Sequence, residues 1–147
     1  MTDSMTRSRE AWPSLPLDAW SDTCATLHLW TQIVGKIRLA QTPWTNHSWH
    51  VTLYVTPRGL TTGSIPYGQR AFQIDFDFIA HELKIQCDDG AAGRFPLKAQ
   101  SVAVFYRRLK EELKKLDLEV KIYLKPNEIP NAVPFDRDEA HAAYDPE

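Results

Sequence analysis

The feature that most constrains the fold of this chain is an alternation of apolar and polar residues within the segment from Ala71 to Ile79. Every second residue from Phe72 to Phe78 is apolar, and the carboxylates Asp75 and Asp77 lie between them. Successive side chains of a β-strand point to opposite faces. The run therefore predicts a strand with one face on a hydrophobic core and the other in water.

Similar strand signals recur along the chain, and their short connections favour antiparallel pairing. The segment Asp88 to Gly90 is typical of a β-hairpin turn, and Pro96 in the following segment indicates an edge strand. The predicted strands cover residues 49–56, 60–65, 71–79, 82–87, 94–98 and 118–124.

Two segments, residues 17–40 and 102–116, have helical periodicity. Ser101 is a suitable N-cap for the second helix. The first helix is apolar on two sides, as in a helix that is sandwiched or lies at an interface. We predict that one side faces the core, with Leu17, Trp20, Cys24, Leu27, Thr31 and Val34. The other side is then a candidate interface, formed by Leu29, Trp30, Ile33 and Ile37.

The order of these elements, α-β-β-β-β-β-α-β, predicts an α+β fold. We expect a mainly antiparallel sheet of five to six strands with two helices packed on one face. A chain of 147 residues has the size of one domain and can bury a core of its own. We predict a flexible N-terminal lead-in over residues 1–13, a single domain over 14–125, and a proline-rich C-terminal tail over 126–147 that either wraps the surface or is disordered.

Charge and apolar content exclude several classes of partner. Seventeen basic residues against nineteen acidic ones give a formal charge of −2, which argues against binding to nucleic acid. No apolar run approaches the roughly 20 residues that span a bilayer, and the N-terminus lacks the apolar core of a signal peptide. The only two cysteines, Cys24 and Cys87, then indicate a reduced, cytoplasmic protein.

Polar residues on the predicted strands form one candidate ligand-binding set. His50 and Tyr54 share a face of the strand over 49–56, and Asp75 and Asp77 share a face of the strand over 71–79. If the two faces coincide, the patch suits a small polar ligand or a His–Asp general base. Otherwise the four residues belong to the ordinary solvent face of an antiparallel sheet.

A second candidate set lies on one flank of the first helix. His28, Gln32 and Lys36 follow one another at a spacing of four residues, so they are neighbours on the helix surface. They either reach a ligand over the edge of the sheet or form a solvated flank.

The sequence offers little for a metal or a cofactor. His47 and His50 are three residues apart at the start of a predicted strand, so their side chains would point to opposite faces. We therefore predict no metal site, and metal binding at this pair is the third alternative. The segment from Gly59 to Ser64 lacks the lysine and the helix of a phosphate-binding loop, and no nucleophile elbow occurs, so we predict no cofactor.

Several strings of this sequence, taken together, resemble the bacterial domain-of-unknown-function family 5996. The similarity covers nearly the whole chain after the lead-in. The strings are WPSLP from Trp12, ATLHLWTQIVGKIR from Ala25, NHSWHV from Asn46, RGLTT from Arg58, IPYG from Ile65, IDFDF from Ile74 and EAHAAYDPE from Glu139.

The resemblance implies no activity and no catalytic residues. It does imply a longer protein, in which these residues are followed by a second half with another Trp-rich helix and aromatic strands. The aromatic residues and the two-sided first helix favour a non-catalytic binding or assembly module that forms a homodimer through that helix. The alternative is a small-ligand-binding protein or an enzyme that uses the His/Tyr/Asp patch, so enzymatic activity stays open.

Overall fold

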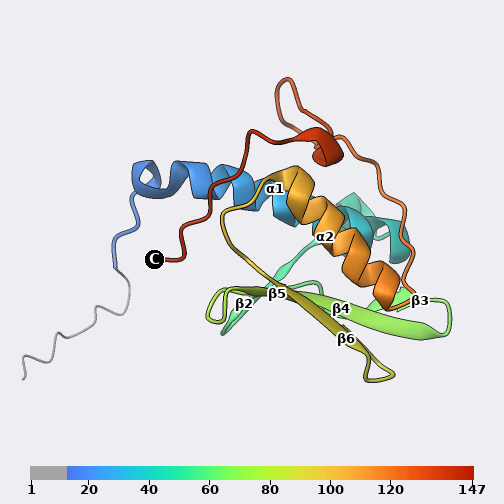
Figure 1. Cartoon of the computed structure of the whole chain (residues 1–147). Helices are drawn as coiled ribbons and strands as arrows, with labels where there is room; N and C mark the ends of the chain where they lie inside the picture. The colour runs from blue at the N-terminus through green and yellow to red at the C-terminus, as the bar shows by residue number, and fades with distance from the viewer. Residues whose placement is uncertain (1–12) are drawn as a thin grey trace, which may run out of the picture.

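Six β-strands form one antiparallel sheet, and two α-helices lie on the same side of it (Figure 1). The computed structural model describes residues 13–147, so the predicted lead-in lies outside the described residues except for Pro13. The α+β fold class is confirmed. The helices are α1 (Leu17–Gln41) and α2 (Val102–Lys115), with 3₁₀ turns η1 (Asn46–Val51) and η2 (Phe135–Arg137). The strands are β1 (Tyr54–Thr56), β2 (Gly59–Thr61), β3 (Ile65–Tyr67), β4 (Arg70–Asp77), β5 (Glu82–Cys87) and β6 (Ala92–Pro96).

The strands follow the order β1-β2-β4-β5-β6, and β3 pairs with β4 on the same edge as β2. The predicted strand over 60–65 is thus divided in two. Between the two parts, Thr62 Oγ1 accepts a hydrogen bond from Ile74 N at 3.0 Å, and Gly63 takes a φ of 63° that glycine adopts without strain. The predicted hairpin after β5 and the edge position of β6 are both confirmed.

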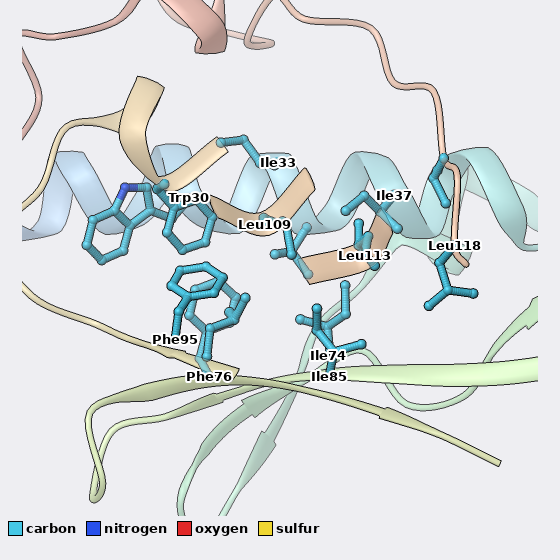
Figure 2. Close-up of a cluster of buried hydrophobic side chains, with 14 of the residues drawn as sticks. Trp30, Ile33, Ile37, Ile74, Phe76, Ile85, Phe95, Leu109, Leu113 and Leu118 are labelled. Carbon is cyan, nitrogen blue, oxygen red and sulfur yellow. The ribbon is translucent and has the colours of Figure 1, made fainter. Parts of the chain in front are cut away.

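The core lies between the inner face of the sheet and the two helices (Figure 2). The alternation predicted for β4 is confirmed, because Phe72, Ile74 and Phe76 are at most 2% exposed. Helix α2 buries one side in this core, as its helical periodicity predicts, and Ser101 Oγ accepts the hydrogen bond of Val104 N as its N-cap. Strand β4 therefore contributes to the core the side chains that the alternation of the sequence predicted.

The side of α1 that faces the core differs from the predicted one. Leu17 is 60% exposed, and Val34 is the one residue of the predicted stripe that is fully buried. Trp20 has a non-helical backbone, with φ −137°, so the helical periodicity counted from Leu17 does not continue past it.

Within residues 13–147, no helix combines the length and the apolar character needed to cross a bilayer.

The four residues predicted as an interface form the core-facing side of α1. Their exposed fractions are 2% for Leu29, 0% for Trp30, 0% for Ile33 and 1% for Ile37. Trp30 stacks on Phe105 of α2, with 4.8 Å between the ring centroids. A partner could reach these side chains only if the core opened, so the prediction of an interface through them is wrong.

The segment predicted as a strand over 49–56 is a strand only at its end. Residues 49–51 belong to the 3₁₀ turn η1, and only Tyr54–Thr56 pairs with β2. Arg38 of α1 holds the segment, because its guanidinium donates to the carbonyl oxygens of His50 and Thr52. The alternation seen in the sequence therefore produces sheet pairing only at Tyr54–Thr56.

The predicted final strand, residues 118–124, is extended but pairs with no strand. Leu118 and Val120 are each 1% exposed and Glu119 lies outside, as the alternation predicts. The backbone hydrogen-bonds to side chains instead of a neighbouring strand: Lys110 Nζ donates to Val120 O, and Tyr67 Oη accepts from Glu119 N at 3.0 Å. The final β of the predicted order is therefore wrong.

The C-terminal tail lies across the helices, and its end returns to the first half of α1 (Figure 1). Phe135 of η2 is fully buried. The Tyr144 ring stacks on Trp30 at 5.7 Å, and Thr26 Oγ1 accepts the hydrogen bond of Ala143 N at 3.2 Å. Of the two alternatives for the tail, the structure has the one in which it wraps the surface.

Candidate functional site

A groove of about 490 Å³ runs along the flank of α1. One wall consists of α1 residues at helical-neighbour spacing. The other side comes from the end of η1, the segment before β1, and β2, and one residue of the tail lies at the border. We call this cavity the α1 groove; its lining residues are His28, Thr31, Gln32, Gly35, Lys36, Leu39, Val51, Leu53, Leu60 and Asn127.

The groove exists because the helix wall carries no side chain at Gly35, in its middle. A β-carbon added there would meet only Val51 O, at 3.7 Å, which is ordinary van der Waals contact. Leu53 and Leu60 line the opposite side and are only partly buried against the core. An apolar surface bordered by a few polar groups is the usual composition of a small-molecule site.

The polar end of the groove is held by contacts between α1 and the tail. Gln32 Nε2 donates to Asn127 O at 3.0 Å, and Asn127 N donates to Gln32 Oε1 at 2.9 Å. Lys36 Nζ donates to Asn127 Oδ1 at 2.7 Å. The His28 ring lies next to them, with its Nε2 3.3 Å from Gln32 Nε2. The structure thus brings together the predicted residues His28, Gln32 and Lys36, and it adds Asn127.

Lys36 has only neutral partners in the part of the chain that the structure describes. None of the carboxylate oxygens of residues 13–147 lies within 4.0 Å of its Nζ. The Tyr123 ring lies against it, with 5.3 Å between Nζ and the ring centroid. Partial burial lowers the pKa of the Lys36 ammonium from its ordinary value.

The outer face of the sheet carries the predicted pair Asp75 and Asp77, which line a second depression of about 460 Å³. Asp77 is 3% exposed, and its Oδ2 accepts hydrogen bonds from Arg58 Nε at 2.8 Å and Lys84 Nζ at 2.6 Å. These contacts, with the backbone N–H of Ala80, hold the pKa of Asp77 well below its usual range. The carboxylate of Asp77 is thus fully used inside the protein, where it closes the turn after β4.

The other two residues of the predicted patch are elsewhere. Tyr54 pairs with Thr61, which pairs with Asp75, so Tyr54 and Asp75 share a face but lie two strands, about 10 Å, apart. His50 is in η1, not on a strand, and is 6% exposed, with its ring edge-on to Trp44 at 5.2 Å. The expectation that His50 and Tyr54 share a strand face is therefore wrong.

Two further histidine contacts were not predicted from the sequence. His141 Nδ1 lies 2.7 Å from Oδ2 of Asp138, which is 3% exposed and also accepts the backbone N–H of His141. His81 Nδ1 lies 2.8 Å from the Tyr144 hydroxyl. The His81–Tyr144 contact fastens the tail to the turn after β4, whereas the His141–Asp138 pair lies within the tail and orders it. The sequence places both partners of the first pair three residues apart, but a stabilising role follows only from the fold.

The side chains that most often bind metals or act as nucleophiles are dispersed or buried. Among residues 13–147, no group of three or more His, Cys, Asp or Glu side chains is placed to hold a metal ion. Both cysteines are free and half-buried. Burial raises the pKa of the Cys87 thiol, which disfavours its reactive thiolate form.

Comparison with known proteins places the chain in a family. The model of a family of unknown function, DUF5996, matches residues 12–147. No curated protein and no solved structure matches the chain significantly. Because the match covers nearly the whole chain, this protein belongs to the DUF5996 family.

Proposed function

We propose that this chain is a non-catalytic binding module that holds a small, largely apolar molecule in the α1 groove. The observation that carries the proposal is the glycine gap in the helix wall opposite Leu53 and Leu60. Helix interiors disfavour glycine by about 0.8–1.0 kcal/mol relative to alanine, so an empty position in the middle of α1 lowers stability while it creates space.

The composition of the groove supports this choice. Leu39, 45% exposed, and the partly buried Leu53 and Leu60 offer apolar surface that the protein's own core does not cover fully. The polar groups are confined to the end where Gln32 meets Asn127. Such an arrangement orients a small molecule without supplying an acid, a base and a nucleophile together.

The proposal also places the protein in the cytoplasm. Two free cysteines, Cys24 and Cys87, favour a compartment that keeps thiols reduced.

The test uses N-phenyl-1-naphthylamine, a neutral probe whose fluorescence rises in apolar sites. We expect saturable binding to the wild-type protein with one probe per chain. The variant Gly35→Leu projects a side chain into the groove from the helix side, and its Cβ meets only Val51 O, at an ordinary contact distance of 3.7 Å, so we expect a folded protein that has lost binding. Fluorescence titration measures binding, and circular dichroism verifies that the variant is folded.

Ala40→Leu is the matched control, because Ala40 is an exposed position of the same helix that does not line the α1 groove. The control is expected to bind the probe as the wild type does. If the wild type fails to bind, or if the two leucine variants behave alike, the proposed function is wrong.

A second candidate function is assembly into a homodimer, as predicted, but through the edge of the sheet in place of α1. Strand β1 pairs with β2 on one side only, and Val55 on it is 86% exposed. An exposed, apolar edge strand is a template for pairing with another chain. Antiparallel pairing of β1 with β1 of a second copy would continue the sheet across a two-fold axis.

Native mass spectrometry tests this second candidate. We expect a dimer of the wild-type chain and a monomer of Val55→Lys, since a lysine on an edge strand opposes pairing. A wild-type monomer at micromolar concentration contradicts it, as does an unchanged dimer of the variant.

A further inference from the structure

The cationic end of the α1 groove specifies what kind of molecule fits it. Lys36 lies one helical turn from Leu39, so the ammonium and the apolar surface are adjacent. A ligand that contacts both needs a polar head next to an apolar body.

The groups that contact the Lys36 ammonium carry no negative charge. Its hydrogen-bond partner, Asn127 Oδ1, is a neutral amide, and the Tyr123 ring is also neutral. A lysine ammonium has three N–H donors, and the described residues accept one of them. A partly desolvated cation with free donors is stabilised by an anion far more than by a neutral group.

The position of Lys36 is fixed before any ligand binds. The two hydrogen bonds between Gln32 and Asn127 hold the tail against α1, and they set the place of the amide that receives Lys36. A preorganised donor loses little conformational entropy when it binds its partner.

We infer that the α1 groove takes amphipathic monoanions, with a carboxylate on Lys36 and an apolar chain over Leu39, Leu53 and Leu60. This inference rests on the proposed function, because it names the ligand class of the same groove. Medium-chain carboxylic acids have this chemistry.

The experiment compares two displacers of N-phenyl-1-naphthylamine with the same chain length, decanoate and the neutral 1-decanol, at pH 7. The ratio of the decanol midpoint to the decanoate midpoint measures the preference for the anion. A charge-assisted hydrogen bond predicts a ratio about tenfold higher in the wild type than in Lys36→Met, which keeps an apolar stem of similar length. Because both displacers are measured on the same variant, a change in the affinity of the probe itself cancels in this ratio.

A second variant places a competing carboxylate inside the protein. Asn127→Asp is isosteric and puts a negative charge on the atom that now lies 2.7 Å from Lys36 Nζ. We expect it to lower the anion preference as Lys36→Met does, although the lysine is retained. Lys98→Met, at an exposed lysine outside the groove, is the control and should keep the wild-type ratio.

The outcomes separate the two proposals. If the probe binds but the ratio is the same in wild type and Lys36→Met, the anion inference is wrong and the groove remains a binding site. If Lys98→Met lowers the ratio as much as Lys36→Met, the preference is a general attraction and the inference is also wrong. If the probe does not bind to the wild type, the proposed function itself fails.

Discussion

Replacing Gly35 by alanine should make the protein more stable and a poorer binder at once. Glycine in a helix interior costs about 0.5–1 kcal/mol relative to alanine. The new methyl group meets Val51 O at 3.7 Å, so no steric strain opposes this gain. For a chain of 147 residues, a gain of this size raises the midpoint of thermal unfolding by about 2–3 °C.

The same methyl group occupies part of the groove wall. One methylene in an apolar site changes affinity by about 1–3 kcal/mol, and the open shape of this groove favours the lower end. We therefore expect N-phenyl-1-naphthylamine to bind about three- to tenfold more weakly to Gly35→Ala, as measured by fluorescence titration alongside thermal unfolding followed by circular dichroism.

Ala25→Gly is the matched control, since Ala25 lies in the same helix but outside the groove. It should lose about as much stability as Gly35→Ala gains and should bind the probe as the wild type does. A loss of stability in Gly35→Ala would refute the reasoning about the helix wall, and unchanged probe affinity in that variant would refute the groove as the binding site.

Three further predictions concern the fold. Ile33→Ala should lower the free energy of unfolding by about 3 kcal/mol in urea titrations, whereas Leu17→Ala should change it by less than about 0.5 kcal/mol; the reverse order would contradict the orientation of α1. Ion pairing lowers the pKa of Asp77 in the folded state, so its stabilisation is present above the unfolded-state pKa of about 3.9 and is lost as the pH falls. Asp77→Asn should therefore flatten acid unfolding between pH 5 and 2, and an unchanged acid profile would contradict this. Asp138→Ala leaves the backbone N–H groups of Ala140 and His141 without their acceptor, which should cost about 1–3 kcal/mol and accelerate hydrogen exchange of this part of the tail; wild-type exchange rates in this variant would contradict the ordering role of Asp138.

The sheet centre and α2 follow from the sequence because local periodicity and burial agree there. Every second residue from Phe72 to Phe76 faces the core, and the partners of β4 and β5 are close in the chain. Helix α1 shows the limit of the same reasoning. It is apolar on two sides, and the choice between them depends on which side meets the sheet and on the break of periodicity at Trp20.

Segments whose contacts are distant in the sequence were predicted less well. Residues 118–124 alternate as a strand does, but their backbone bonds to the side chains of Lys110 and Tyr67 and pairs with no strand of the sheet. The contact of Arg38 with the carbonyl of His50 likewise cannot be predicted from the spacing of apolar residues. Alternation predicted which side chains are buried in 118–124, and it did not predict what the backbone pairs with.

The residues of the α1 groove were also predicted only in part from the sequence. His28, Gln32 and Lys36 follow from helical spacing alone, because residues four apart are neighbours. Asn127 joins them from a position 91 residues beyond Lys36, and only the path of the tail brings it there. Gly35 is visible in the sequence, but its meaning depends on Leu53 and Leu60 across the gap.

The return of the tail to α1 also has a consequence for the order of events during synthesis. Tyr144, which covers the Trp30 indole, follows it by 114 residues in the chain. At about 5–20 residues per second, a ribosome needs roughly 6–23 s to make that stretch. Throughout this interval the nascent α1 lacks the cover of its central tryptophan. The nascent chain is therefore expected to be vulnerable to aggregation until Tyr144 has emerged from the ribosome, and a translational pause before that point would prolong the vulnerable state.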